Sequence, residues 1–140
     1  MTVSSLRALV VDDSPTIRNF VTATLESAGY EVTTAKSGFE ALKVLPSNAF
    51  HLVVTDVNMP DINGLELVRY VRQSPLHKGT PLIIISTDGR ERDRDRGMAL
   101  GASAYLVKPF QPEALLALAQ QVTAPGFNVA PQMAAPKKKT

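Results

Sequence analysis

Residues 52–67, LVVTDVNMPDINGLEL, join an apolar run to an acidic residue, a proline-containing turn and the start of an amphipathic segment. The run before Asp56 is apolar and rich in valine, which is typical of a short strand buried on both faces. After Pro60, the residues Leu65, Val68 and Val71 recur at helical spacing. The stretch therefore predicts a buried strand that carries a carboxylate to its end and is followed by a helix.

The same alternation of strand and helix occurs five times along the chain. An alternating series predicts parallel strands joined by right-handed crossovers, with helices on both faces of the sheet. We expect an α/β fold, specifically a three-layer αβα sandwich around a five-stranded parallel sheet. The expected strands are residues 7–11, 30–35, 50–55, 81–86 and 104–107, and the expected helices are residues 14–29, 37–45, 64–73, 90–101 and 111–122.

Several helix ends carry recognisable signals. Pro15 and Pro112 suit a first helical turn and Gly29 suits a C-terminal cap, while Ser37 and Glu40 have the spacing of a capping box. The segment 90–101, RERDRDRGMALG, has like charges four residues apart and an internal glycine. We expect it to be the least stable helix of the domain.

Length and composition narrow the class of protein. The 140 residues fit one domain, which we place at residues 1–122, with a disordered Pro-, Ala- and Lys-rich tail at 123–140. Without the three lysines near the C-terminus, 12 basic side chains face 13 acidic ones, so we expect no direct nucleic-acid contact. Cysteine is absent, and no segment suggests export or membrane insertion, so we expect a cytoplasmic protein.

Polar side chains stand at or just after the ends of four of the predicted strands. Asp12 and Asp13 follow the first, Asp56 the third, and Lys108 the fifth, while Ser86 ends the fourth. The carboxyl ends of parallel strands share one edge, where open α/β folds bind ligands, so these groups should converge. Clustered carboxylates repel unless a cation neutralises them, and hard oxygen ligands favour Mg²⁺. Taken alone, the acid pair has a simpler interpretation, in which Asp13 or Ser14 caps the following helix.

A carboxylate placed beside a divalent cation and an ammonium group is well suited to accept a phosphoryl group, because both cations offset charge on the phosphoryl oxygens. This arrangement makes Asp56 the candidate nucleophile.

With these residues in place, the sequence closely resembles the response-regulator receiver domains of two-component signalling from about residue 6 to residue 122. The motifs VVDDS, VVTDVNMPDINGLEL, IIIST and GASAYLVKPF have the order and spacing of that family. The resemblance implies a flavodoxin-like strand order of 2-1-3-4-5. It also implies phosphorylation at Asp56 by a sensor histidine kinase or a histidine phosphotransfer protein.

The family's site residues map onto matching positions. By resemblance, Asp12, Asp13 and Asp56 bind Mg²⁺ together with the backbone carbonyl of Asn58. Ser86 and Lys108 assist Asp56 in phosphoryl transfer. The receiver catalyses its own phosphorylation and dephosphorylation but is a signalling protein, which we do not class as an enzyme.

The resemblance also implies how the signal leaves the site. Ser86 and Tyr105 are the switch residues, and they alter a partner-binding face made by the fourth helix, fifth strand and fifth helix. The weak helix at 90–101 is our candidate for the bistable element. Asn58, Thr87 and Asp88 are expected to tune the phosphoryl lifetime, and the chain is expected to be a monomer or a weak, phosphorylation-dependent dimer.

Two other functions of similar folds require residues that this sequence lacks. A haloacid-dehalogenase-type phosphatase would need a second aspartate where Asn58 stands. A nucleotide-binding sheet would need a Gly-rich phosphate loop, and the sequence has none. Within the receiver family, the chain is expected to be a stand-alone switch of the chemotaxis or phosphorelay kind. The alternatives are a fragment of a longer regulator or a phosphate-independent binding module.

Overall fold

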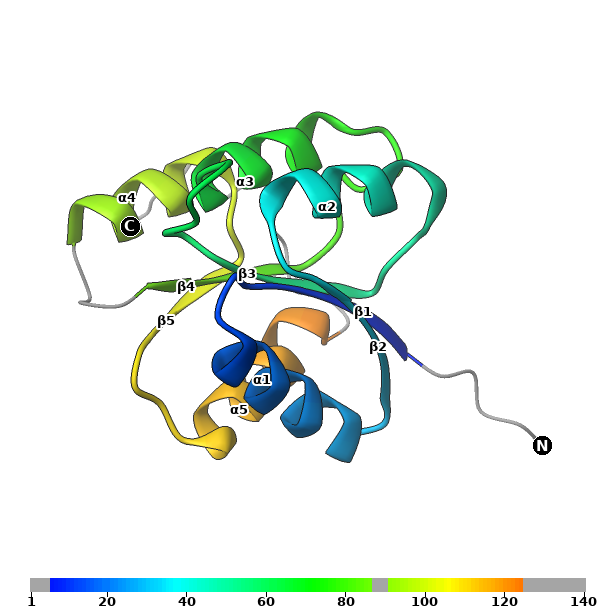
Figure 1. Cartoon of the computed structure of the whole chain (residues 1–140), viewed down its shortest axis with the longest axis vertical. Coiled ribbons are helices and arrows are strands. Elements are labelled where there is room, and N and C mark those ends of the chain that lie inside the picture. The colour runs from blue at the N-terminus through cyan, green and yellow to red at the C-terminus, as the bar shows by residue number, and fades with distance from the viewer. Residues whose placement is uncertain (1–5, 87–90, 125–140) are drawn as a thin grey trace.

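The computed structural model describes residues 6–86 and 91–124. Five parallel strands form one sheet in the order β2-β1-β3-β4-β5, as expected. Helices α1 and α5 cover one face of the sheet, and α2, α3 and α4 cover the other (Figure 1). The elements are β1 (Leu6–Val11), α1 (Pro15–Ser27), β2 (Tyr30–Ala35), α2 (Gly38–Val44), the 3-10 turn η1 (Leu45–Ser47), β3 (Leu52–Asp56), α3 (Gly64–Gln73), β4 (Leu82–Ser86), α4 (Glu91–Leu100), β5 (Ala104–Val107) and α5 (Pro112–Thr123).

Alternation along the central strands builds a separate core on each face of the sheet. Val53 and Ile84 pack with α2, α3 and α4, whereas Val54, Ile83 and Ile85 pack with α1 and α5. Every residue of β3 and β4 is buried, including the polar side chains at their ends. The two cores therefore hold both strands rigidly from either side, which fixes the position of their C-terminal residues.

The helix N-termini settle a choice that the sequence left open. Ser14 caps α1, because its hydroxyl accepts a hydrogen bond from the Ile17 N–H at 3.3 Å. Asp13 is thus free of the capping role.

Helix α2 departs slightly from its expected capping box. The Ser37 hydroxyl accepts from the Glu40 N–H as predicted, but the Glu40 carboxylate accepts from the Lys36 N–H, one residue before the expected Ser37 N–H.

Two glycines allow helices α3 and α4 to pack closely against strands β3 and β4. A β-carbon on Gly64, the first residue of α3, would collide with the backbone carbonyl of Asp56. A β-carbon on Gly97 would collide with the Ile84 side chain, so this glycine lets α4 approach β4 closely. The sequence had indicated only that Gly97 weakens its helix. Its packing role depends on a contact between elements far apart in the chain.

Helix α5 includes Thr123, which the sequence placed in the tail, and the Thr123 hydroxyl donates to the Ala119 carbonyl oxygen at 2.7 Å. Residues 125–140 lie outside the described part of the chain, so the expectation for the rest of the tail stays a prediction. Within the described ranges, no helix combines the length and apolarity needed to cross a membrane.

Candidate phosphoacceptor site

The C-terminal edge of the sheet brings the predicted polar residues together. Val11 lies beside Thr55 in the parallel register, so Asp12 follows β1 next to Asp56 at the end of β3. Asp56 in turn lies beside Ile85, and Ser86 ends β4 one residue further on. Lys108 directly follows β5, and its N–H donates to the Ser86 carbonyl oxygen at 2.8 Å. Four strand ends thus supply one site.

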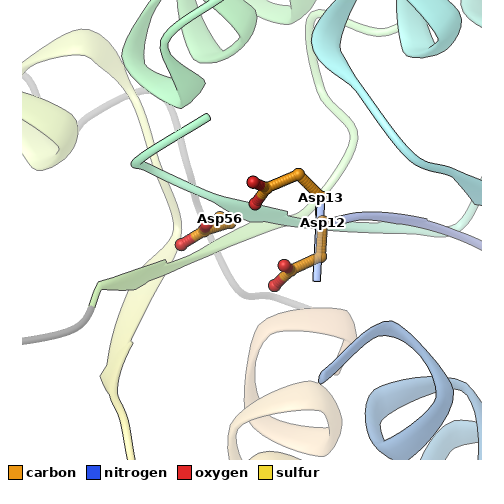
Figure 2. A group of neighbouring side chains, drawn as sticks. All are labelled: Asp12, Asp13 and Asp56. Carbon is orange, nitrogen blue, oxygen red and sulfur yellow. The ribbon is translucent and has the colours of Figure 1, made fainter. Parts of the chain in front are cut away.

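Three carboxylates form the acidic part of the site. One oxygen from each of Asp12, Asp13 and Asp56 lies within 4.8 Å of the others (Figure 2). Asp12 and Asp56 are buried, with 1% and 3% of their surface exposed, whereas Asp13 is exposed. The site therefore has a buried floor of two carboxylates and one carboxylate on its open side.

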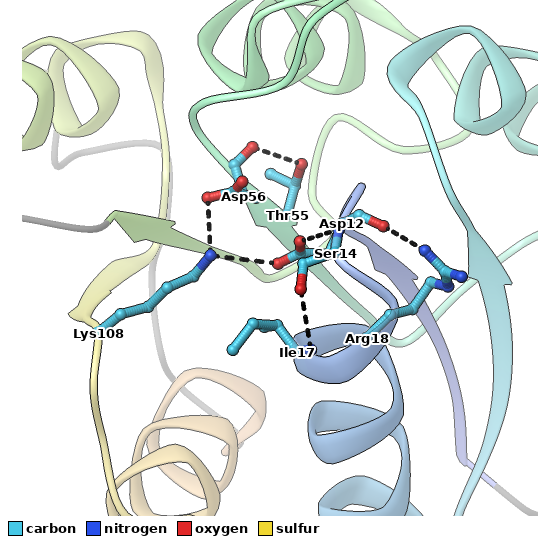
Figure 3. A network of polar contacts seen from close by, with 7 residues as sticks. All are labelled: Asp12, Ser14, Ile17, Arg18, Thr55, Asp56 and Lys108. Carbon is cyan, nitrogen blue, oxygen red and sulfur yellow. Dashed lines mark hydrogen bonds and ion pairs between the residues drawn. The ribbon is translucent and has the colours of Figure 1, made fainter.

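The Lys108 ammonium group bridges the two buried carboxylates. Its Nζ lies 3.6 Å from Asp12 Oδ2 and 3.5 Å from Asp56 Oδ1 (Figure 3). Only 16% of the Lys108 side chain is exposed, so this charge is weakly screened by water. One cation facing two buried carboxylates leaves the site with surplus negative charge even before the exposed Asp13 is counted.

That surplus changes the acidity of the buried groups. The pKa of Asp56 is raised from its usual 3.8 to about 6, mainly by burial and also by the neighbouring Asp12, while Lys108 partly opposes both effects. Burial also raises the pKa of Asp12, against the lowering effects of the Ser14 N–H and Lys108. Both shifts have the same physical cause, which is an ionised carboxylate held away from water with too little positive charge beside it.

Three buried oxygen atoms at this edge have no hydrogen-bond partner within the described part of the protein: Asp12 Oδ2, Asp56 Oδ1 and Ser86 Oγ. The two carboxylate oxygens face the Lys108 ammonium, but at ion-pair distances that are too long for a hydrogen bond. Buried polar atoms are rarely left unpaired, because losing water without a replacement partner costs free energy. Such atoms commonly mark a place where an ion or ligand group binds. The donor set consists of hard oxygens, which suits a small divalent cation such as Mg²⁺.

Of the remaining predicted residues, the structure describes Asn58 and Tyr105. Asn58 is exposed in the loop after β3. Tyr105 is half-buried on β5, and its hydroxyl accepts a hydrogen bond from Arg94 NH1 of α4 at 2.9 Å. Thr87 and Asp88, the other two residues expected to tune lifetime, lie outside the described residues. The geometry therefore brings together Asp12, Asp13, Asp56, Ser86 and Lys108.

Two further residues support the site and were missed from sequence. Arg18 of α1 donates from NH1 to the Asp12 backbone carbonyl at 2.7 Å (Figure 3). The Asp61 carboxylate, in the loop after β3, accepts from the N–H groups of Gly38 at 3.2 Å and Phe39 at 2.8 Å, which ties this loop to the start of α2. Both contacts join separate elements, so no local sequence motif predicts them.

The comparisons with known proteins agree with this geometry. The family model described as "Response regulator receiver domain" matches residues 8–120. The chain belongs to this family. The receiver domain is 42% identical over 112 residues to chemotaxis protein CheY1 of Helicobacter pylori, a match covering 79% of this chain and 90% of that protein.

Solved structures and longer regulators give the same result. The chemotaxis response regulator CheY4 of Vibrio cholerae is 43% identical, with a TM-score of 0.80 over 85% of this chain and 99% of that one. The phosphate regulon transcriptional regulatory protein PhoB of Pseudomonas aeruginosa is 34% identical over 126 residues, which cover 88% of this chain but 55% of that protein. The receiver domain is thus similar to nearly the whole length of the two chemotaxis proteins and to part of a longer regulator.

Proposed function

We propose that this receiver domain is a phosphorylation-activated switch whose phosphoryl acceptor is the Asp56 carboxylate. The observation that carries the proposal is the position of Asp56 Oδ1: it is buried, has no hydrogen-bond partner among the described residues, and lies 3.5 Å from the Lys108 ammonium. Burial, negative charge and a neighbouring ammonium group suit a nucleophile that must attack an anionic phosphoryl group. Asp12 Oδ2 has a similar setting, at 3.6 Å from the same ammonium, and Asp56 is preferred because it matches the family's phosphoacceptor position.

In the transfer step, an Asp56 carboxylate oxygen forms a bond to the phosphorus of a phosphohistidine on a partner protein. The P–N bond of the donor breaks, and its electron pair stays on the imidazole nitrogen, which takes a proton from water. Lys108 Nζ, already beside Asp56, is placed to stabilise the negative charge on the phosphoryl oxygens. The Ser86 hydroxyl, unpaired and buried at the next strand end, is placed to donate a hydrogen bond to the new phosphoryl group.

The acidic residues fit Mg²⁺. Asp12, Asp13 and Asp56, with the backbone carbonyl of Asn58, would hold the ion. The assignment is supported by Asp12 Oδ2 and Asp56 Oδ1, which are buried and accept no hydrogen bond among the described residues. When bound, Mg²⁺ would reduce repulsion between the carboxylates and the incoming phosphoryl oxygens. Hydrolysis by water would regenerate the Asp56 carboxylate and release inorganic phosphate, with Asn58, Thr87 and Asp88 proposed to set the rate.

We further propose that α4, β5 and α5 form the face that reports phosphorylation to a downstream protein. Tyr105 lies on β5 and contacts α4 through Arg94, so a change at the neighbouring end of β4 has a short path to this face. The similarity to chemotaxis proteins supports a stand-alone switch fed by a sensor histidine kinase or a phosphotransfer protein. We propose that it acts as a monomer or a weak phosphorylation-dependent dimer, as a signalling protein and without turnover of a separate substrate.

Incubation with acetyl phosphate and Mg²⁺, followed by intact-mass measurement, tests the proposal. The wild-type chain should gain the mass of one phosphoryl group, and Asp56→Asn should gain none. Asp95→Asn is the matched control, because it removes a carboxylate whose side chain is 72% exposed on α4, and it should behave as wild type. Equal labelling of Asp56→Asn and wild type would refute Asp56 as the acceptor, and omission of Mg²⁺ with no loss of rate would refute the metal requirement.

A further inference from the structure

We propose that Arg18 is a positioning residue for the metal site, acting through the peptide bond between Asp12 and Asp13. The inference rests on the proposed Mg²⁺ site and extends it to a side chain outside the set of ligands. The guanidinium group of Arg18 binds a backbone carbonyl and thereby fixes the direction from which the Asp13 carboxylate reaches the ion.

The contact is short and local to the site. Arg18 begins the second turn of α1, where its own N–H donates to the Ser14 carbonyl at 2.9 Å. From there the side chain reaches back past the helix N-terminus, and NH1 donates to the Asp12 carbonyl at 2.7 Å (Figure 3). A hydrogen bond from a charged donor at this distance is among the stronger kinds found in proteins.

The rest of Asp12 is held by other groups. Its N–H donates to the Ala35 carbonyl at 3.1 Å, and its Oδ1 accepts from the Ser14 N–H at 2.9 Å. These bonds fix the amide side and the side chain of Asp12. The Arg18 bond holds the carbonyl side, which shares a rigid plane with the N–H and Cα of Asp13.

Asp13 is the ligand most in need of this support. Asp12 and Asp56 are buried and held by the surrounding core, whereas Asp13 is exposed, so packing does not fix its carboxylate. Its place within 4.8 Å of the other two carboxylates therefore depends on the backbone that carries it. Residues that orient metal ligands from outside the coordination sphere typically change metal affinity by roughly 10- to 100-fold when removed.

Arg18 also carries a positive charge. Its charge and its positioning of Asp13 should change Mg²⁺ affinity in opposite directions. A cation near the site repels Mg²⁺, so a role through charge alone predicts tighter Mg²⁺ binding when Arg18 is replaced by a neutral residue. A positioning role predicts weaker binding. A role limited to joining α1 to β1 predicts lower stability with no change in Mg²⁺ affinity. The direction of the change in Kd thus separates the three possibilities.

The experiment measures Mg²⁺ binding to the unphosphorylated full chain by calorimetry, for wild type, Arg18→Met, Arg18→Lys and the control Arg69→Met. Arg69 lies on α3 with 52% of its side chain exposed, and its replacement makes the same change in charge. We expect Arg18→Met to weaken Mg²⁺ binding roughly tenfold, the lower end of the range for such partners. Arg18→Lys should bind more tightly than Arg18→Met, because it keeps a charged donor, and Arg69→Met should match wild type.

A spectroscopic measurement accompanies the binding data. In the metal-free chain, Arg18→Met should shift the amide resonance of Asp13, because this N–H shares the peptide whose carbonyl loses its hydrogen bond, whereas Arg69→Met should leave the resonance in place. Equal or tighter Mg²⁺ binding by Arg18→Met overturns the inference. If that variant does not fold, Arg18→Gln replaces it under the same criterion. Wild type that binds no Mg²⁺ overturns the metal site itself, and so distinguishes failure of the proposed function from failure of the role of Arg18 alone.

Discussion

Asp56→Asn should stabilise the metal-free protein at neutral pH, although it removes the proposed reactive group. The ionised carboxylate is held in a buried site beside Asp12, and Lys108 offsets only part of the cost. Asparagine has nearly the same shape and carries no charge, so it removes that cost. We therefore expect the variant that lacks the proposed phosphoryl acceptor to be the more stable protein.

The magnitude follows from the pKa of Asp56. Its rise from 3.8 to about 6 is a difference of about 2.2 pH units, which corresponds to about 3 kcal/mol. Because the pKa in the folded state lies above that of the unfolded chain, the stabilising contribution of the protonated carboxyl is complete below about pH 4 and is lost as pH rises through about 6. The gap between Asp56→Asn and wild type should thus be near zero at pH 4 and reach about 3 kcal/mol above pH 7.

The assay is denaturant unfolding in the presence of a chelator, at several pH values, for wild type, Asp56→Asn and Asp95→Asn. In thermal unfolding, the same difference of about 3 kcal/mol would correspond to roughly 10 °C in Tm for a domain of this size. The control removes an exposed carboxylate and should stay within about 0.5 kcal/mol of wild type. Mg²⁺ at about 100 times its Kd should stabilise wild type by about 2.7 kcal/mol and largely close the gap.

Two outcomes would refute this reasoning. The first is equal stability of wild type and Asp56→Asn at pH 7.5 without metal, since the carboxylate would then carry no burial cost. The second is a gap that persists unchanged at pH 4, which would assign the effect to packing and exclude ionisation as its cause.

Three other substitutions have defined outcomes. Asp61→Ala should cost about 0.5–2 kcal/mol and speed amide exchange at the start of α2, because two N–H groups lose their acceptor; unchanged exchange there would contradict the contact. Gly64→Ala should cost about 1–3 kcal/mol in chemical unfolding, since its β-carbon would meet the Asp56 backbone, whereas Gly79→Ala is the matched control with open space around the new atom. Lys108→Met should raise the pKa of Asp56, measured by carbon NMR of its carboxyl group, and a lower value would show that Lys108 does not offset its charge.

The sheet and the grouping of polar residues at its edge were predictable because both follow from short sequence patterns and their order along the chain. Each strand is an apolar run of about the right length, and parallel strands necessarily bring their carboxyl ends together, so Asp56 and Lys108 could be placed at one edge in advance. Family resemblance then supplied the strand order, which the comparisons and the sheet confirm.

The features that escaped prediction depend on contacts between distant elements. Arg18 and Asp61 reach backbone groups of neighbouring segments, and their spacing matches no motif. From sequence, Gly97 was predicted only to destabilise its helix, whereas in the structure it lets α4 pack against Ile84. The choice between Asp13 and Ser14 as the cap of α1 required the geometry of the turn, since both stand just before Pro15.

The most direct test of the central claim is to identify the phosphorylated residue without altering the chain. Borohydride reduces an acyl phosphate to the alcohol, so treatment after incubation with acetyl phosphate and Mg²⁺ converts a phosphorylated aspartate to homoserine, which peptide mass spectrometry can locate. We predict conversion at Asp56 alone. Conversion at Asp12 or Asp13, or no conversion at any aspartate, would contradict the assignment of Asp56 as the phosphoryl acceptor.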